Sequence, residues 1–184
     1  TFDNGVLTIS VLDDDPENKF MGFGMIPDFE VEGEEEDMVI SSPRWSFKDD
    51  IESIVIEEGI VSIGEYAFPQ CFYVESLTLP INILRIGRSA FYACTSLTEL
   101  TIPTVTLKDD YDEYYVLDIE SYAFAGCIGI ELITCYQPTP PEYAGNSFAG
   151  MNVANITVYV PEEYLEDYEE SDWSEFDLKA IPDL

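Results

Sequence analysis

The chain contains no histidine and very little positive charge. Its 184 residues include 38 aspartates and glutamates but only 7 lysines and arginines, for a formal net charge of -31. Without an imidazole there is no conventional catalytic triad and no HExxH zinc site. A surface that neutralises phosphates needs clustered basic residues, and only Arg85 and Arg88 lie close together, so nucleic acid and anionic membranes are poor partners. Cationic partners, metal ions or basic proteins would be attracted, although dispersed charge also serves solubility alone.

The chain also lacks the motifs that hold nucleotides, zinc or a lipid bilayer. It has neither standard spacing of a glycine-rich phosphate loop nor a CxxC pair, so we expect no cofactor. No apolar run approaches the roughly 18 residues of a membrane span, which argues against direct membrane insertion by these residues. No signal peptide with a basic start precedes Thr1, so we interpret the sequence as a mature or trimmed form.

The most informative feature is a phrase that recurs along the chain. Its clear copies are IGEYAFPQC (63–71), IGRSAFYAC (86–94) and IESYAFAGC (119–127), and NSFAGM (146–151) is a fourth, degraded copy. The alanines of the clear copies lie 23 and 33 residues apart, and Phe148 follows Phe124 by 24 residues. A period in the twenties predicts a solenoid whose units bury their apolar sides against one another. The longer interval contains LKDDYDEYYV (107–116), which we interpret as an insertion in a turn.

A second regular element runs between these phrases. It reads VESLTLP (74–80), LTELTIP (97–103), IELITC (130–135) and VANITVYVP (153–161), with Ile156 and Val158 as the core pair of the last copy. Core residues alternate with polar ones, which is typical of strands with one buried face, and we expect a parallel sheet along the stack.

The residue between each pair of core positions should point outward and form a candidate binding column. The column follows Val55 and comprises Thr78, Thr101, Thr134 and Thr157. It is bordered by the acidic residues Glu52, Glu75 and Glu131. The sheet side of a solenoid is commonly a binding surface, but threonine also suits any solvated strand.

The four cysteines argue against two disulfides. Cys71, Cys94 and Cys127 each follow the repeated phenylalanine by three residues, and Cys135 falls on a core strand position. We predict free, buried thiols that close each turn onto the core. Stacked units lie about 5 Å apart, a separation that also allows a bridge between Cys71 and Cys94, so the sequence leaves that disulfide open.

The insertion is a second candidate binding surface. Acidic and aromatic side chains alternate in it: Asp109, Asp110, Tyr111, Asp112, Glu113, Tyr114 and Tyr115. Aromatic rings beside carboxylates on an exposed loop suit a basic or sugar-bearing partner, and the alternative is a solvated loop whose tyrosines pack back on the repeats. The carboxylates alone would suit calcium, but the glycine and distal glutamate of an EF-hand are missing, so this indication is weak. It is equally weak for Asp13, Asp14 and Asp15.

Both ends are expected to cap the stack within a single domain. We assign residues 1–50 to an N-terminal cap region, 51–160 to the repeats and 161–184 to a C-terminal cap. Pro161 followed by two glutamates predicts a helix start. Tyr164, Leu165 and Tyr168 would share one face of that helix, and Trp173 and Phe176 would complete the seal.

The L-x-x-L-x-L strand followed by IG-x-x-AF-x-x-C resembles the BspA-like leucine-rich repeat family of bacterial cell-surface proteins. The resemblance covers roughly residues 51–161. GVLTIS (5–10), MIPDF (25–29) and PRW (43–45) resemble the opening cap of that family, and 158–176 resembles its closing segment. The asparagine ladder of ordinary leucine-rich repeats is missing, and Met151 stands in the cysteine position of the fourth copy. The resemblance implies a curved, right-handed, mainly β solenoid with short helical turns, outside the cell or on its surface.

Together these observations predict a non-enzymatic recognition or adhesion module. It would bind a protein or glycan, including one from a host, through the strand face or the insertion. A structural spacer within a surface assembly is the first alternative. A carboxylate-dependent, glycan-active enzyme is the second, and it would need two carboxylates about 5 to 9.5 Å apart in a concave pocket, one of them with a raised pKa.

Overall fold

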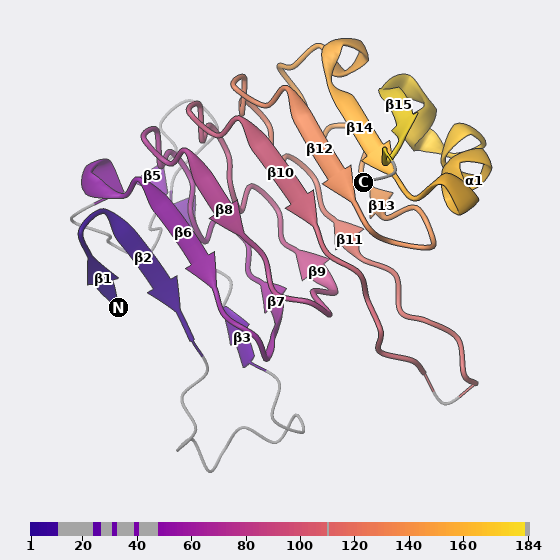
Figure 1. Cartoon of the computed structure of the whole chain (residues 1–184). Helices are drawn as coiled ribbons and strands as arrows, with labels where there is room; N and C mark the ends of the chain where they lie inside the picture. The colour runs from indigo at the N-terminus through magenta and orange to yellow at the C-terminus, as the bar shows by residue number, and fades with distance from the viewer. Residues whose placement is uncertain (11–23, 27–30, 33–38, 41–47, 110, 183–184) are drawn as a thin grey trace.

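Parallel strands that lie side by side along the molecule dominate the architecture (Figure 1). The computed structural model describes residues 1–10, 24–26, 31–32, 39–40, 48–109 and 111–182. The predicted opening-cap segments MIPDF and PRW lie partly or wholly outside these residues, as do Asp13, Asp14 and Asp15.

In the described part of the chain, seven parallel strands make one side of the molecule. They are β2 (Val6–Ile9), β6 (Ser53–Ile56), β8 (Ser76–Thr78), β10 (Glu99–Ile102), β12 (Leu132–Cys135), β14 (Thr157–Val160) and β15 (Asp177–Ala180). They form two sheets that lie edge to edge, with β8 beside β10 (Figure 1). Ile54 pairs with Leu77, 23 residues later, and Leu100 pairs with Ile133 across the insertion. The strands predicted from alternating core residues are therefore present.

The first residues of the chain contribute to this stack and also cover its edge. β1 (Phe2–Asp3) runs antiparallel to β2, and a tight turn at Asn4 and Gly5 joins the two strands. Both turn residues have positive φ, 47° and 79°, which asparagine and glycine tolerate best. Because β2 pairs in parallel with β6, part of the region assigned to the N-terminal cap adds a rung of its own.

A second parallel sheet lies behind the first, and the sequence patterns did not predict it. Its strands are short: β3 (Gly24–Ile26), β7 (Ile60–Ile63), β9 (Arg85–Ile86), β11 (Asp118–Ile119) and β13 (Glu142–Tyr143). The isoleucine that opens each copy of the repeated phrase is the signal for these strands, since Ile63, Ile86 and Ile119 all lie on them and are fully buried. A separate antiparallel pair joins β4 (Val31–Glu32) to β5 (Val39–Ile40), and η1 (Lys48–Asp50) precedes β6.

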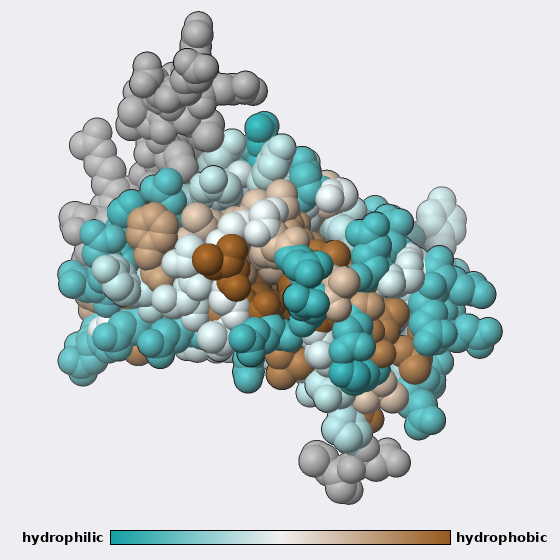
Figure 2. Space-filling model, turned by 90° about the horizontal axis from the view of Figure 1, so that it is seen from above, coloured by the Kyte–Doolittle hydropathy of each residue, from teal (hydrophilic) through white to brown (hydrophobic). Residues whose placement is uncertain are grey.

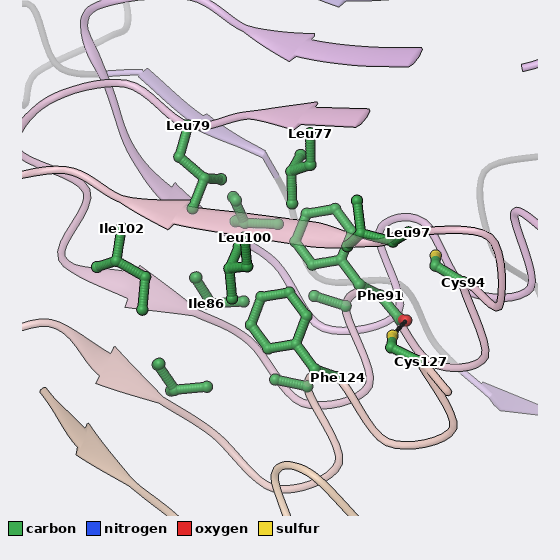
Figure 3. Close-up of a cluster of buried hydrophobic side chains, with 14 of the residues drawn as sticks. Leu77, Leu79, Ile86, Phe91, Cys94, Leu97, Leu100, Ile102, Phe124 and Cys127 are labelled. Carbon is green, nitrogen blue, oxygen red and sulfur yellow. Dashed lines mark hydrogen bonds between the residues drawn. The ribbon is translucent and has the colours of Figure 1, made fainter. Parts of the chain in front are cut away.

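The repeated Ala-Phe turns join the two sides and stack in register. Phe68, Phe91, Phe124 and Phe148 form a column with ring centroids 5.3 to 5.7 Å apart and nearly parallel planes. Phe91 and Phe124 of this column are seen in Figure 3, with the core leucines and isoleucines of the strands beside them. Backbone N–H groups of one turn donate to carbonyls of the next, for example from Phe91 to Ala123 at 2.8 Å.

Left-handed backbone positions shape these turns. The residue before the alanine has positive φ at Tyr66, Ser89 and Tyr122, and the residue two after the phenylalanine has positive φ at Gln70, Ala93, Gly126 and Gly150. Such angles cost non-glycine residues about 1 kcal/mol or more, so the buried phenylalanine and the hydrogen-bond ladder must offset strain in the units of Phe68, Phe91 and Phe124. In the unit of Phe148 the positive φ falls on Gly150, which adopts it without strain.

All four cysteines are free and fully buried. Cys94 donates to the carbonyl of Phe68 at 3.4 Å, and Cys127 donates to that of Phe91 at 3.1 Å (Figure 3). Hydrogen bonding with Cys127 and Cys71, together with burial, raises the pKa of Cys94 well above its ordinary value. Burial raises the pKa of Cys135 to about 11. The thiols of Cys94 and Cys135 are therefore protonated at neutral pH and serve as small core residues.

An aromatic cluster closes the C-terminal end. Four short elements build it: η3 (Glu162–Tyr164), α1 (Leu165–Glu169), η4 (Asp172–Glu175) and β15. Trp173 contacts Phe148 edge-on and stacks on Phe176, while its Nε1 donates to the carbonyl of Pro141 at 2.8 Å. Tyr168, Trp173 and Phe176 are buried, so the residues predicted to seal the last core row do pack against it. The sequence did not predict that a strand, β15, extends the sheet beyond them.

One predicted register is wrong. Thr134 pairs with Tyr159, and Thr157 lies opposite Leu132, so Val158 and Val160 hold the core positions that we assigned to Ile156 and Val158. The cause is η2 (Val153–Asn155): Val158 follows Phe148 by ten positions, whereas Ile133 follows Phe124 by nine. Valine or isoleucine occupies 153, 156, 158 and 160, so the alternation fits both registers.

Candidate functional site

The seven parallel strands expose two rows of side chains, which we call the strand face. The first row comprises Val6, Ser53, Ser76, Glu99, Leu132, Thr157 and Asp177. The second comprises Thr8, Val55, Thr78, Thr101, Thr134, Tyr159 and Lys179. The structure therefore brings Thr78, Thr101 and Thr134 into the predicted column, but Tyr159 and not Thr157 continues it, and Thr157 belongs to the first row.

From β2 to β14 the strand face is nearly uncharged, with Glu99 as the one charged residue among twelve outward positions, although the chain has a net charge of -31. Glu99, Asp177 and Lys179 are its charged residues, and the last two pair with each other at 2.6 Å. The hydrogen bond from Lys179 also lowers the pKa of Asp177. The exposed carboxylates collect at the margin instead, at Glu52, Glu75 and Glu131, each directly before a strand. Contact with another molecule would therefore desolvate mainly hydroxyl and β-branched side chains, which costs less than desolvating carboxylates when the partner hydrogen-bonds the hydroxyls.

Two adjoining hollows lie at the upper edge of the strand face, which is formed by the N-terminal ends of β10, β12 and β14 (Figure 1). One, of about 360 Å³, is lined by Thr98, Glu99, Glu131, Leu132, Thr157 and Tyr159. The other, of about 490 Å³, includes Ile128, Glu131, Met151, Asn155 and Thr157 in its lining, so the two share Glu131 and Thr157. Seen from above, exposed apolar side chains lie between polar ones across the middle of the molecule (Figure 2).

The insertion projects from the body as a hairpin-like loop (Figure 1). Lys108 bridges to Tyr114 in antiparallel fashion, its ammonium group lies 4.4 Å from the centre of the Tyr114 ring, and it pairs with Asp112 at 2.9 Å. Asp109 Oδ1 accepts from the backbone N–H groups of Tyr111 and Glu113. Tyr111 is 86% exposed and projects into solvent, whereas about half of each of Tyr114 and Tyr115 is covered.

Asn82 holds the base of this loop. Its side-chain oxygen accepts hydrogen bonds from the backbone N–H and the hydroxyl of Thr106, at 2.7 and 2.9 Å, and from the N–H of Leu107 at 3.2 Å. Asn82 itself has a φ of 64°. The sequence patterns missed this residue because it lies outside both repeated phrases.

A cluster of charge lies on the second sheet. Arg85 donates to both carboxylate oxygens of Glu120, at 2.6 and 3.1 Å, and the backbone N–H of Arg88 adds a third bond at 2.9 Å. Partial burial, then the neighbouring charges of Glu120 and Glu142, raise the pKa of Asp118. A hollow of about 240 Å³ includes Asp118 and Glu120 in its lining. Both oxygens of Glu120 already accept hydrogen bonds, which favours a structural role for this carboxylate over that of a nucleophile.

No metal site emerges from the described part of the chain, where no group of three or more acidic or cysteine side chains is placed to hold an ion. In the insertion, the Asp109 carboxylate is engaged by the loop backbone.

A family model described as the BspA type leucine rich repeat region (6 copies) matches residues 39–158 and 111–176. The chain belongs to this family. No curated protein and no solved structure gives a significant match.

Membership in this family indicates the general properties of such repeats. Leucine-rich repeats typically mediate protein interactions and are generally non-enzymatic, and BspA-type members are usually surface or extracellular bacterial proteins. Among the residues that the structure describes, no helix is long and apolar enough to cross a membrane.

Variants of Asn82 would test whether its side chain tethers the insertion to the BspA-type repeats. Replacing Asn82 by glycine keeps the positive φ but removes the acceptor for Thr106 and Leu107. We expect the loop to open more often, so that trypsin cleaves after Lys108 about fivefold faster, as the loss of about 1 kcal/mol of hydrogen bonding would allow. Asn82→Asp retains an acceptor and should be cleaved at the wild-type rate. Equal rates for all three proteins would contradict the tethering role.

Asp118 predicts a pH-dependent change in stability. Its folded-state pKa is raised, so the ionised carboxylate destabilises the fold above the ordinary value of 3.8. We expect Asp118→Asn to increase the free energy of unfolding at pH 7, by less than about 1 kcal/mol because the site is largely solvated. The gain should disappear as the pH falls below 3.8, where Asp118 is neutral in both states. Urea titrations at pH 7 and pH 3.5 would measure it, and an equal gain at both pH values would contradict this assignment.

Proposed function

We propose that this chain is a non-enzymatic recognition module of a bacterial cell surface, built as a curved, right-handed solenoid of units of about 23 residues. It binds a protein or glycan ligand through the strand face, with the insertion as a second contact. The observation that carries the proposal is the nearly uncharged strand face in a chain of net charge -31.

Solubility alone explains acidic residues spread over the surface, but it does not explain their scarcity on the six adjacent strands from β2 to β14, where Glu99 is the one acid among twelve outward positions. Hydroxyl groups such as those of Thr78, Thr101 and Thr134 offer donors and acceptors without the desolvation cost of carboxylates. Tyrosines in the insertion add rigid amphipathic area, which is enriched in binding sites. The alternatives are a structural spacer in a surface assembly and, with less support, a carboxylate-dependent glycan-active enzyme at Asp118 and Glu120.

The test is binding to a glycan array and to a panel of extracellular-matrix proteins. Three altered proteins accompany the wild type: Thr101→Lys on the strand face, a deletion of residues 107–116, and the matched control Thr139→Lys at an exposed loop position. We expect at least one ligand whose binding falls about tenfold or more in Thr101→Lys or in the deletion, a loss of about 1.4 kcal/mol or more, and is unchanged in the control.

Binding that survives both changes would refute the assigned surfaces. Absence of any ligand, with all four proteins melting cooperatively, would favour the spacer. Hydrolysis of a glycan that is lost in Asp118→Asn would instead support the enzyme.

A further inference from the structure

The two hollows at the upper edge of the strand face arise where the stack is irregular. In the units of Phe68, Phe91 and Phe124, the first core residue of the strand follows the phenylalanine by nine positions. In the last unit, Val158 follows Phe148 by ten positions. The extra residue is taken up in η2, which replaces the single hydrogen-bonded turn of the earlier units, such as the one from the Ile130 N–H to the Cys127 carbonyl at 3.1 Å. Gly150, with a φ of 82°, and Met151 lead into this turn in place of the cysteine-closed turn of the earlier units.

The two hollows together form one groove, and its lining combines apolar side chains with glutamates that form no ion pair within the described part of the chain. Ile128 is 68% exposed, the most exposed aliphatic side chain among the described residues, and Met151 lies across from it in the same hollow. Glu99 and Glu131 line the adjoining hollow with Leu132 and Tyr159. Neither glutamate forms an ion pair with a lysine or arginine of the described residues. Lys179 borders the groove, 3.5 Å from the hydroxyl oxygen of Thr157, but its charge is paired with Asp177 at 2.6 Å.

We infer that this groove binds an extended segment of a partner protein in which a lysine or arginine neighbours a large apolar side chain. The inference rests on the proposed function and names the partner chemistry at one end of the strand face. The apolar side chain would enter the hollow beside Ile128 and Met151, and the basic group would lie between Glu99 and Glu131.

Two features favour this occupant. The hollows, of about 360 and 490 Å³, are each large enough to receive a large side chain, and they adjoin along the strand face as successive side chains of an extended segment would require. An incoming cation gains attraction from two unpaired carboxylates and from the surrounding negative field, whereas an acidic or phosphorylated segment would be repelled. The charge contribution should weaken as added salt screens it.

The experiment is selection from a random peptide display library on the wild-type protein, followed by affinity measurements on the enriched peptides as synthetic, fluorescently labelled probes. Three variants accompany it: Glu99→Gln with Glu131→Gln, Ile128→Ser, and the control Glu163→Gln with Glu166→Gln, whose exposed carboxylates lie on the C-terminal elements. We expect peptides that carry a basic residue next to an apolar one, bound about tenfold more weakly by each groove variant and equally well by the control.

Ile128 and the two glutamates are solvent-facing, so the variants should fold, and matching melting curves would establish this. Enrichment of peptides without a basic residue, equal affinity for groove variants and wild type, or no enrichment at all would overturn the inference. The proposed function can fail separately: a ligand lost in Thr101→Lys but retained by both groove variants would support the strand face and reject this groove.

Discussion

Replacing Phe124 by alanine is expected to lower the free energy of unfolding by about 3 to 5 kcal/mol. Phe124 is fully buried at the centre of the phenylalanine column, 5.3 Å from Phe91 and 5.7 Å from Phe148 between ring centroids. Alanine would leave a cavity between the rings of Phe91 and Phe148, beneath the turn whose left-handed residues are Tyr122 and Gly126. The loss would therefore include both buried apolar area and support for a strained backbone.

Urea unfolding followed by circular dichroism would measure the effect. Phe124→Leu keeps most of the volume and should cost less than about 1.5 kcal/mol, although it loses the ring stacking. Tyr111→Ala removes an aromatic ring that is 86% exposed and should leave stability within about 0.5 kcal/mol of the wild type. A Phe124→Ala protein as stable as Tyr111→Ala would show that the column does not support the stack.

The strands and the core could be predicted because the same spacing recurs in several copies. Leu77, Leu100 and Ile133 occupy one position of successive phrases, and a buried position that repeats is far more informative than one apolar residue. The phenylalanine of the phrase recurs at the same spacing, but we did not predict that these rings form a buried column. Its stacking geometry was not predictable, because it follows from backbone angles at residues as different as Tyr66, Ser89 and Tyr122.

The rest could not be read from the pattern for specific reasons. Strands of two residues such as β9 and β11 are too short for alternation to appear, so the second sheet was missed. In the last unit, apolar residues at 156, 158 and 160 fitted two registers, and the turn in η2 decided between them. The groove beside Ile128 depends on that turn. A candidate binding column could therefore be predicted from Thr78 and Thr101, whereas the hollow at its end could not.

Truncation after Val160 is expected to abolish cooperative melting or to cause aggregation. It would remove β15, which pairs along the whole of β14, and the aromatic rings that cover Phe148. The exposed surface would be an open parallel edge beside a row of apolar core residues, a combination that favours association between chains. Size-exclusion chromatography and calorimetry of the truncated protein would test this, and a monomer with an unchanged melting transition would contradict it.

A point variant separates the aromatic seal from the missing strand. Trp173→Ala keeps β15 and its backbone pairing but removes the ring that contacts Tyr143, Phe148, Tyr168 and Phe176. It should cost about 3 to 5 kcal/mol, while the protein remains monomeric because the edge stays covered. If Trp173→Ala aggregates as the truncation does, exposure of the aromatic core drives association. If it is destabilised but monomeric, β15 prevents association by occupying the edge of β14, and the aromatic cluster provides the stability that keeps β15 in place.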